Sequence, residues 1–232
     1  MRNPDCKLCP LHQHVKTVCV DGFGSAKPRF LFVGEGPGKE EDEQGQPFVG
    51  DAGKLLREHI KKFGLFPARL TYCVRCRPPE DREPKQDEIY ACRPYLSAEI
   101  MERKPDFIVA VGGTALKVLA KLTGITTWSG RIAGEIKGMT VLGLLSPSYV
   151  LRSGAYENFR ADCVSLREVA DTVTLFKKRF PKASIKDAEG FTMPDSIREI
   201  STLEDRQAEM MMKFKQRLRP FLMAQVPGLL TK

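Results

Sequence analysis

Four cysteines in two spaced pairs are the side chains of this sequence best suited to holding a metal. Two residues separate Cys6 from Cys9, and fifteen separate Cys76 from Cys92. Thiolates are soft ligands that suit zinc or an iron–sulfur cluster, each with a roughly tetrahedral arrangement of sulfur. The spacing therefore predicts a metal centre without distinguishing between the two metals.

A loop rich in glycine and proline is the second feature that could take part in binding or catalysis. Residues 34–38 read Gly-Glu-Gly-Pro-Gly and directly follow the apolar residues 30–33, and residues 45–50 form a second such stretch. An apolar strand that opens into a glycine turn is typical of a rigid loop facing a ligand. The loop lacks the Lys-Ser/Thr pair of a P-loop, which disfavours a nucleotide-binding enzyme.

Composition narrows the class of protein. With 232 residues, of which 42% are hydrophobic, the chain can form one full core and an extension. Its net charge of +8 favours a polyanionic partner such as nucleic acid. There is no run of 18 apolar residues and no apolar leader, so we expect no membrane span and a cytoplasmic location. Thiols stay reduced there, and seven cysteines then favour metal ligation over disulfides.

The elements expected around these motifs alternate between strand and helix. Such alternation predicts an α/β fold, a three-layer α/β/α sandwich around a mostly parallel sheet, with ligand-facing loops at the carboxyl ends of the strands. Gly34, Cys73 and Ser146 should meet at that edge, and Thr114 should cap a helix. We expect strands at residues 30–33, 70–74, 107–111 and 140–145, and helices at residues 52–63, 87–103 and 115–122.

The C-terminal part of the sequence has a different character. We expect residues 1–171 to form the main domain and residues 172–232 to form a basic linker followed by an amphipathic helix from Pro194. Such a helix packs on the core or recruits a protein partner, and a monomer is the expected state. Its apolar face consists of Ile197, Ile200, Leu203, Met210, Phe214 and Leu218.

Several of these motifs, taken in order, resemble those of family 4 uracil-DNA glycosylases over about residues 1–170. The resemblance implies the fold of that superfamily, and a structural [4Fe-4S] cluster on Cys6, Cys9, Cys76 and Cys92, with zinc as the second choice. The matching segments are Cys6 to Leu11, Gly34 to Gly38 with Glu41 and Asp42, residues 45–53, and Cys76 to Pro79 followed by Arg82, Pro84 and Cys92.

The resemblance also implies which residues meet the sugar and the base. Glu35 and Gly36 would lie beside the sugar and the attacking water, where a carboxylate can orient water and stabilise a cationic sugar. Phe48 would be the platform on which the flipped base stacks, a role suited to an exposed ring on a glycine-flanked loop. Taken alone, Phe48 would indicate packing in the core.

Residues 149–152 resemble the loop that members of the family wedge into DNA. Val150 and Leu151 would fill the space left by the flipped nucleotide, and Arg152 would pair with a phosphate. The alternative is an ordinary turn between a strand and a helix.

Two positions depart from the family pattern. Tyr72 stands where the family has an Asn that reads the uracil edge, and Ser146-Pro147-Ser148 replaces a His-Pro-Ser/Ala motif. All three histidines of the chain precede residue 60, so none can replace the missing one. Loss of one hydrogen-bond donor to an atom that gains charge in the transition state raises the activation free energy by about 3 kcal/mol. Ser146 becomes the expected catalytic donor, and Tyr72 and Ser148 become the expected base contacts.

The sequence therefore predicts a DNA glycosylase that acts weakly on uracil or on another altered or modified pyrimidine. Excision of a modified base in antiviral defence is one alternative. A catalytically weak DNA-binding or damage-sensing module is the other.

Overall fold

The structure, a computed structural model, describes residues 3–179. The helix expected from Pro194 onward lies outside the described residues. Contacts within the chain divide it into residues 1–167 and residues 168–232, and the sheet belongs to the first unit. The predicted domain boundary at residue 171 stays a prediction.

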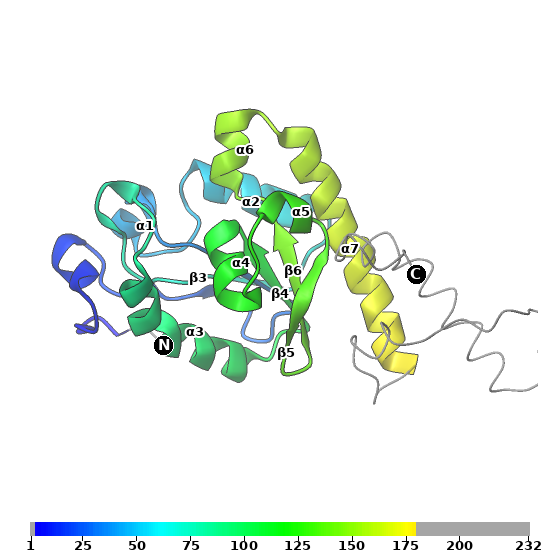
Figure 1. The fold of residues 1–232 in the computed structure, drawn as a ribbon, viewed down its shortest axis with the longest axis horizontal. Coiled ribbons are helices and arrows are strands. Elements are labelled where there is room, and N and C mark those ends of the chain that lie inside the picture. The colour runs from blue at the N-terminus through cyan, green and yellow to red at the C-terminus, as the bar shows by residue number, and fades with distance from the viewer. Residues whose placement is uncertain (1–2, 180–232) are drawn as a thin grey trace, which may run out of the picture. The chain divides into compact units, whose positions relative to one another are not determined.

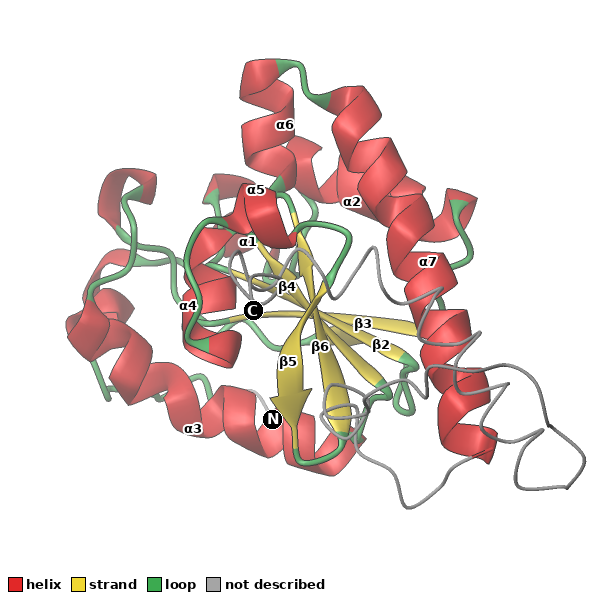
Figure 2. Ribbon diagram, turned by 45° about the vertical axis from the view of Figure 1, so that its right-hand side comes forward, coloured by secondary structure: helices red, strands yellow, loops and turns green. Residues whose placement is uncertain are grey.

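A six-stranded sheet forms the centre of the first unit, in the order β1-β3-β2-β4-β6-β5 (Figure 2). The four inner strands are parallel, and the two edge strands are antiparallel to their neighbours. The predicted mostly parallel sheet is thereby confirmed. The strands are β1 Phe23–Gly24, β2 Phe30–Gly34, β3 Ala68–Tyr72, β4 Phe107–Val111, β5 Ile132–Ile136 and β6 Met139–Leu144.

Helices cover both faces of the sheet, as the predicted three-layer sandwich requires (Figure 1). On one face, Leu31 and Ile108 share a buried core with Leu96 of α3 and Leu116 of α4. The helices of the described part are η1 Pro10–His14, α1 Lys39–Gln44, α2 Asp51–Lys62, η2 Pro79–Asp81, α3 Gln86–Arg103, α4 Gly113–Ala120, α5 Ile125–Trp128, α6 Pro147–Ser153 and α7 Tyr156–Arg179.

Parallel pairing brings the ends of the inner strands to one edge of the sheet. Gly34, the last residue of β2, lies opposite Tyr72, the last residue of β3. Val111 ends β4 beside Leu144, which ends β6. The loops that follow these strands therefore converge, as expected from the sequence. None of the helices in the described range combines the length and apolar character needed to cross a membrane.

Two local expectations need correction. Thr114 does not cap α4, because the helix begins at Gly113 and its N-cap is Gly112, which has a φ of +91°. Glycine tolerates this conformation, so the turn places Thr114 inside the first helical turn instead. Residues 149–152 are helical, within α6, rather than a turn.

Candidate functional site

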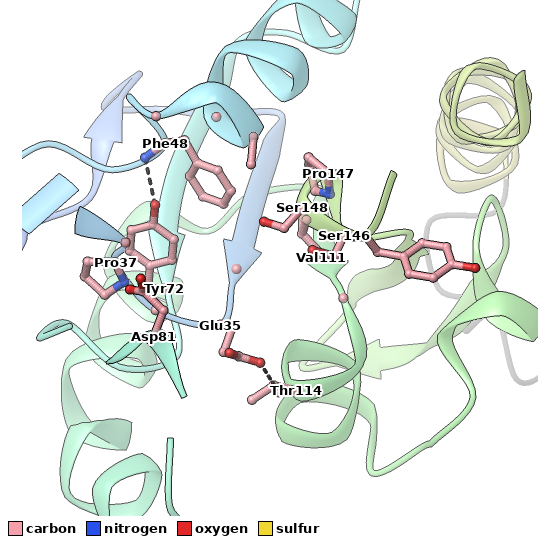
Figure 3. Close-up of a pocket in the computed structure, with 18 of the residues that line it drawn as sticks. Glu35, Pro37, Phe48, Tyr72, Asp81, Val111, Thr114, Ser146, Pro147 and Ser148 are labelled. Atoms are coloured by element: carbon pink, nitrogen blue, oxygen red, sulfur yellow. Dashed lines mark hydrogen bonds between the residues drawn. The ribbon is translucent and has the colours of Figure 1, made fainter. Parts of the chain in front are cut away.

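A cleft of about 860 Å³ opens at the carboxyl edge of the parallel strands (Figure 3). Its walls come from the loop after β2, the stretch around Phe48, the end of β3, residues 78–83, and the loops after β4 and β6. Elements distant in sequence thus contribute to one concave site, which is the usual position of a ligand site in such folds.

Glu35 supplies a partly buried carboxylate to this cleft. It follows Gly34 directly, and Thr114 Oγ1 donates a hydrogen bond of 2.5 Å to its Oε2. Burial raises the pKa of Glu35 above its usual value, and the Thr114 hydrogen bond partly opposes that rise. A carboxylate in this setting can hold a water molecule and accept its proton.

Glu41 fastens the two glycine-rich loops to each other. Its Oε2 accepts the Gly38 backbone N–H at 2.9 Å, and its Oε1 accepts the N–H groups of Val49 and Gly50, each at 2.9 Å. The side chain is buried, so these three bonds are charge-assisted and shielded from water. Glu41 therefore fixes the loop carrying Glu35 relative to the loop carrying Phe48.

Phe48 has a left-handed backbone conformation, with a φ of +56°. Arg57 stabilises this turn because its Nε donates to the Phe48 carbonyl at 2.9 Å and its Nη2 to the Pro47 carbonyl at 2.8 Å. Gly53 leaves room for the turn, since a Cβ there would lie 2.0 Å from the Phe48 backbone. Such strained conformations persist where the surroundings impose them, and they cluster at functional sites.

Tyr72 stacks directly on Phe48. The ring centroids are 4.7 Å apart with the planes inclined by 22°, and the Tyr72 hydroxyl accepts the Phe48 N–H at 2.7 Å. Phe48 is only 6% exposed, so the expectation of an exposed ring is wrong, because Tyr72 covers it. Burial raises the pKa of Tyr72 well above its usual value, so the phenol is neutral.

Gly34 is the residue that leaves room for this pair of rings. A Cβ at Gly34 would lie 2.7 Å from Phe48 Cζ and 3.0 Å from the Tyr72 ring. Any larger residue at the end of β2 would displace the two rings.

Ser146 and Ser148 lie across the cleft from Phe48 and Tyr72, at the start of α6 (Figure 3). The residue before them is held in place, because the Leu145 N–H donates to Ser129 Oγ at 2.8 Å. Ser129 Oγ in turn donates to the Asp162 carboxylate. These contacts anchor the loop that carries the serines.

Histidine does not line the cleft in the described part of the chain. His59 is buried in α2, where its ring lies 5.0 Å from the Phe159 ring, and its Nδ1 is 2.9 Å from the Leu55 carbonyl oxygen. It therefore belongs to the core.

α6 presents only part of the segment expected to contact DNA. Val150 is fully buried, so its predicted insertion into DNA is wrong for this structure, because the helix turns this side chain into the core. Leu151 and Tyr149 are about two-fifths exposed, at 40% and 43%, and Arg152 lines the cleft.

The cysteines expected to hold a metal lie near one another. Cys76 and Cys92 share a buried cluster, against which Cys9 packs, and proximity to Cys6 contributes to the raised pKa of Cys9, after burial itself. Two backbone N–H groups point at this cluster, from Cys19 to Cys76 Sγ at 3.4 Å and from Arg75 to Cys92 Sγ at 3.3 Å. Within residues 3–179, no group of three or more His, Cys, Asp or Glu has the arrangement that holds a single metal ion.

Sequence reasoning missed the side chains that hold the site together. Asp162 and Arg57 gave no local signal, because their partners lie 33 and about ten residues away in the chain. In the sequence, Glu41 stands out only as part of a motif. Thr114 follows two glycines, a pattern that favours a cap over a contact to Glu35.

Fold and cleft together define an α/β enzyme with its ligand site at the carboxyl edge of the sheet. A sequence model of the uracil DNA glycosylase superfamily matches residues 22–166. The type-4 uracil-DNA glycosylase of Thermotoga maritima is 40% identical over 177 residues, covering 75% of this chain and 90% of that protein. That of Archaeoglobus fulgidus is 34% identical over 175 residues, covering 71% and 87%.

The chain belongs to the uracil-DNA glycosylase superfamily and resembles its family 4. Membership makes it a DNA N-glycosylase, a hydrolase of glycosyl bonds. A DNA polymerase of Bacillus phage SP01 is also similar, 36% identical over 143 residues, which cover 60% of this chain and 15% of the polymerase. A segment of this kind thus also occurs within a much longer protein.

Proposed function

We propose that the protein hydrolyses the N-glycosidic bond of an altered pyrimidine flipped out of DNA, with uracil as a slow substrate or another modified base as the preferred one. The observation that carries this proposal is the Glu35 carboxylate, partly buried in the cleft and held by Thr114. The superfamily match and the net charge of +8 support DNA as the substrate.

Glu35 acts on the attacking water in this proposal. Thr114 engages Oε2, which leaves Oε1 to receive the proton of a water molecule beside the sugar. The water oxygen bonds to the sugar C1′ while the bond from C1′ to the base nitrogen breaks, and the bonding pair leaves with the base. The base then takes up a proton, and an abasic site remains. Gly36 has no side chain, so its backbone can lie close to the reacting sugar.

Ser146 and Ser148 are the donors on the opposite side of the cleft. Their hydroxyls can each donate one hydrogen bond to the oxygen of the departing base as it gains charge. A short neutral hydroxyl reaches less far than an imidazole, so we expect slower release of uracil than the family pattern would give.

Tyr72 sets the choice of base. Its hydroxyl already accepts the Phe48 N–H, so its own proton is what it can donate to a base. Its ring also covers one face of the Phe48 ring, so that face is closed to a stacked base. A base whose ring packs against Tyr72 is therefore favoured. A hydrogen bond from the Tyr72 hydroxyl does not itself exclude uracil, which also carries acceptor oxygens.

The same stack favours one competing function. If Tyr72 keeps every base away from Phe48, the protein is a catalytically weak DNA-binding or damage-sensing module. Excision of modified bases in antiviral defence uses the chemistry proposed above and differs only in the base.

Cys6, Cys9, Cys76 and Cys92 would hold a [4Fe-4S] cluster. A single zinc ion needs all its sulfur ligands at about 2.3 Å from one point, whereas a cluster spreads its thiolates over several irons. The similarity to type-4 uracil-DNA glycosylases favours the cluster over zinc, and the backbone N–H groups directed at two of the sulfurs suit thiolate ligands. Its role is structural, since it would join the N-terminal segment to β3 and α3.

The test is base release from labelled oligonucleotides. Uracil opposite G, opposite A and in single strands is compared with hydroxymethylated and glucosylated pyrimidines, beside a Glu35→Gln control. Abasic sites that form with one base and disappear in the control establish the glycosylase and name its base. Intact DNA throughout, from protein that binds DNA, supports the binding module instead.

A further inference from the structure

A second hollow, of about 330 Å³, lies between α3 and α4. Tyr90 and Arg93 reach it from α3, where they lie three residues apart and so share one face. Lys117 and Lys121 reach it from α4 and its C-cap. We call this hollow the α3–α4 groove and define it by these four residues.

The groove adjoins the cleft. Glu83 and Thr114 line both hollows, and Thr114 is also the hydrogen-bond partner of Glu35. A strand of nucleic acid whose nucleotide occupies the cleft can therefore continue into the groove.

The cleft itself is poorly suited to phosphate. Of the basic residues lining it, Arg82 is paired with Glu88 at 2.6 Å, which leaves Lys39 and Arg152. Phosphates beside this acidic wall are repelled, so the cations that hold them must lie around it. The acidic residues lining the cleft are Glu35, Glu40, Glu41, Asp51, Asp81 and Glu83.

The groove offers those cations together with an aromatic ring. Arg93, Lys117 and Lys121 are exposed, and in the described part of the chain none of the three takes part in a salt bridge. Tyr90 is 72% exposed, an unusual setting for a large ring without a partner. Cations that follow a backbone, beside a ring that stacks on a base, are the features of sites for single-stranded nucleic acid.

We propose that the α3–α4 groove binds a nucleotide flanking the reacting one on the same DNA strand. Lys117, Lys121 and Arg93 hold its phosphates, and Tyr90 stacks on its base. The proposal rests on the proposed function only for the identity of the strand, because it concerns binding and not base release.

The test measures binding of the full chain to a fluorescent single-stranded DNA of about 16 nucleotides. All proteins carry Glu35→Gln, so that no base is released, and anisotropy is recorded over a series of salt concentrations. Replacing both lysines, Lys117→Gln with Lys121→Gln, should weaken binding about tenfold at low salt. It should also reduce the slope of log K against log salt by about 1.4, the value for two lost contacts to a single strand.

A matched pair of lysines provides the control. Lys27 and Lys137 are exposed and precede β2 and β6, at the opposite edge of the sheet from the cleft. Lys137 and Lys121 both have a positive φ, 48° and 61°. Each double variant therefore places one glutamine in a left-handed backbone conformation, so any strain from that change is matched. Lys27→Gln with Lys137→Gln should leave both the affinity and the slope unchanged.

Tyr90 is tested separately, because stacking does not depend on salt. Tyr90→Leu should weaken binding about tenfold with the slope unchanged, and Tyr90→Phe should keep the affinity. Equal losses in the two lysine pairs, unchanged binding in Lys117→Gln with Lys121→Gln, or no binding by the parent would overturn the proposal. Base release plays no part in these measurements, so a failed groove and a failed glycosylase are distinguishable.

Discussion

At the scale of single residues, Glu35 and Thr114 should determine how the rate of base release depends on pH. Burial raises the pKa of Glu35, and the donor from Thr114 lowers it, because a hydrogen bond to the carboxylate favours the charged form. If Glu35 accepts a proton from water, base release needs its carboxylate. Activity should then fall as the pH drops through a pKa above 4.5, the ordinary value for a Glu side chain.

Thr114→Val should shift this fall in activity, the acid limb of the pH profile, to higher pH. The variant keeps the size of the side chain but removes the donor, so the pKa of Glu35 rises further and the carboxylate is protonated at a higher pH. The measurement is kcat/KM for base release against pH. Thr114→Ser keeps the hydroxyl and should retain the parental limb; an unchanged profile in Thr114→Val would show that Glu35 does not set it.

Tyr72→Asn should increase uracil release about tenfold. The change uncovers Phe48 and adds an amide donor and acceptor, and each 1.4 kcal/mol of added transition-state binding gives a factor of ten. Tyr72→Phe keeps the ring in place and should give no gain. If single-turnover rates on uracil-containing DNA rise equally in both variants, the covering ring is not what limits the reaction.

At the scale of elements, one carboxylate holds two loops in register. Glu41→Gln should lower the free energy of unfolding by about 3 kcal/mol, because Gly38, Val49 and Gly50 would lose charge-assisted bonds in a buried position. Glu43 lies on the same helix but is exposed, with a 3.5 Å pair to Lys16, so Glu43→Gln should cost less than about 1 kcal/mol. Urea denaturation of both variants checks this difference.

The same scale shows what a sequence can reveal. β2 and β4 are apolar runs that lead into glycine, at Gly34 and Gly112, so the sequence predicts both strands within one residue. β1 has two residues and β5 contains an irregularity near Gly134, so neither shows the alternation of apolar and polar residues that reveals a strand. α7 was also missed, although Phe159 and Cys163 lie four residues apart and are buried.

The candidate site was predicted in its residues but not in its contacts. Glu35, Ser146 and Tyr72 line one cleft, as their positions after parallel strands imply. The stack of Tyr72 on Phe48 could not be foreseen, because it depends on the turn at Phe48 and on the absence of a side chain at Gly34.

At the scale of the whole molecule, the cysteine centre joins segments that the sheet does not. Cys6 and Cys9 lie before the first strand, Cys76 follows β3, and Cys92 lies in α3. If a cluster holds these four, its loss removes one of the links between the N-terminal segment and the rest of the fold, beside the bonds of Thr17 to Asp42. Binding energy of the metal is then also folding energy.

Cys92→Ser should therefore lower both the iron content and the thermal stability. We expect the visible absorption of an iron–sulfur cluster in the parent, its loss in the variant, and a drop in Tm of about 10 °C or more. Cys163 is also buried but lies in α7, so Cys163→Ser tests a cysteine outside the centre and should keep the parental iron content. Full iron content in Cys92→Ser, or its loss in Cys163→Ser, would show that the metal is held by a different set of residues.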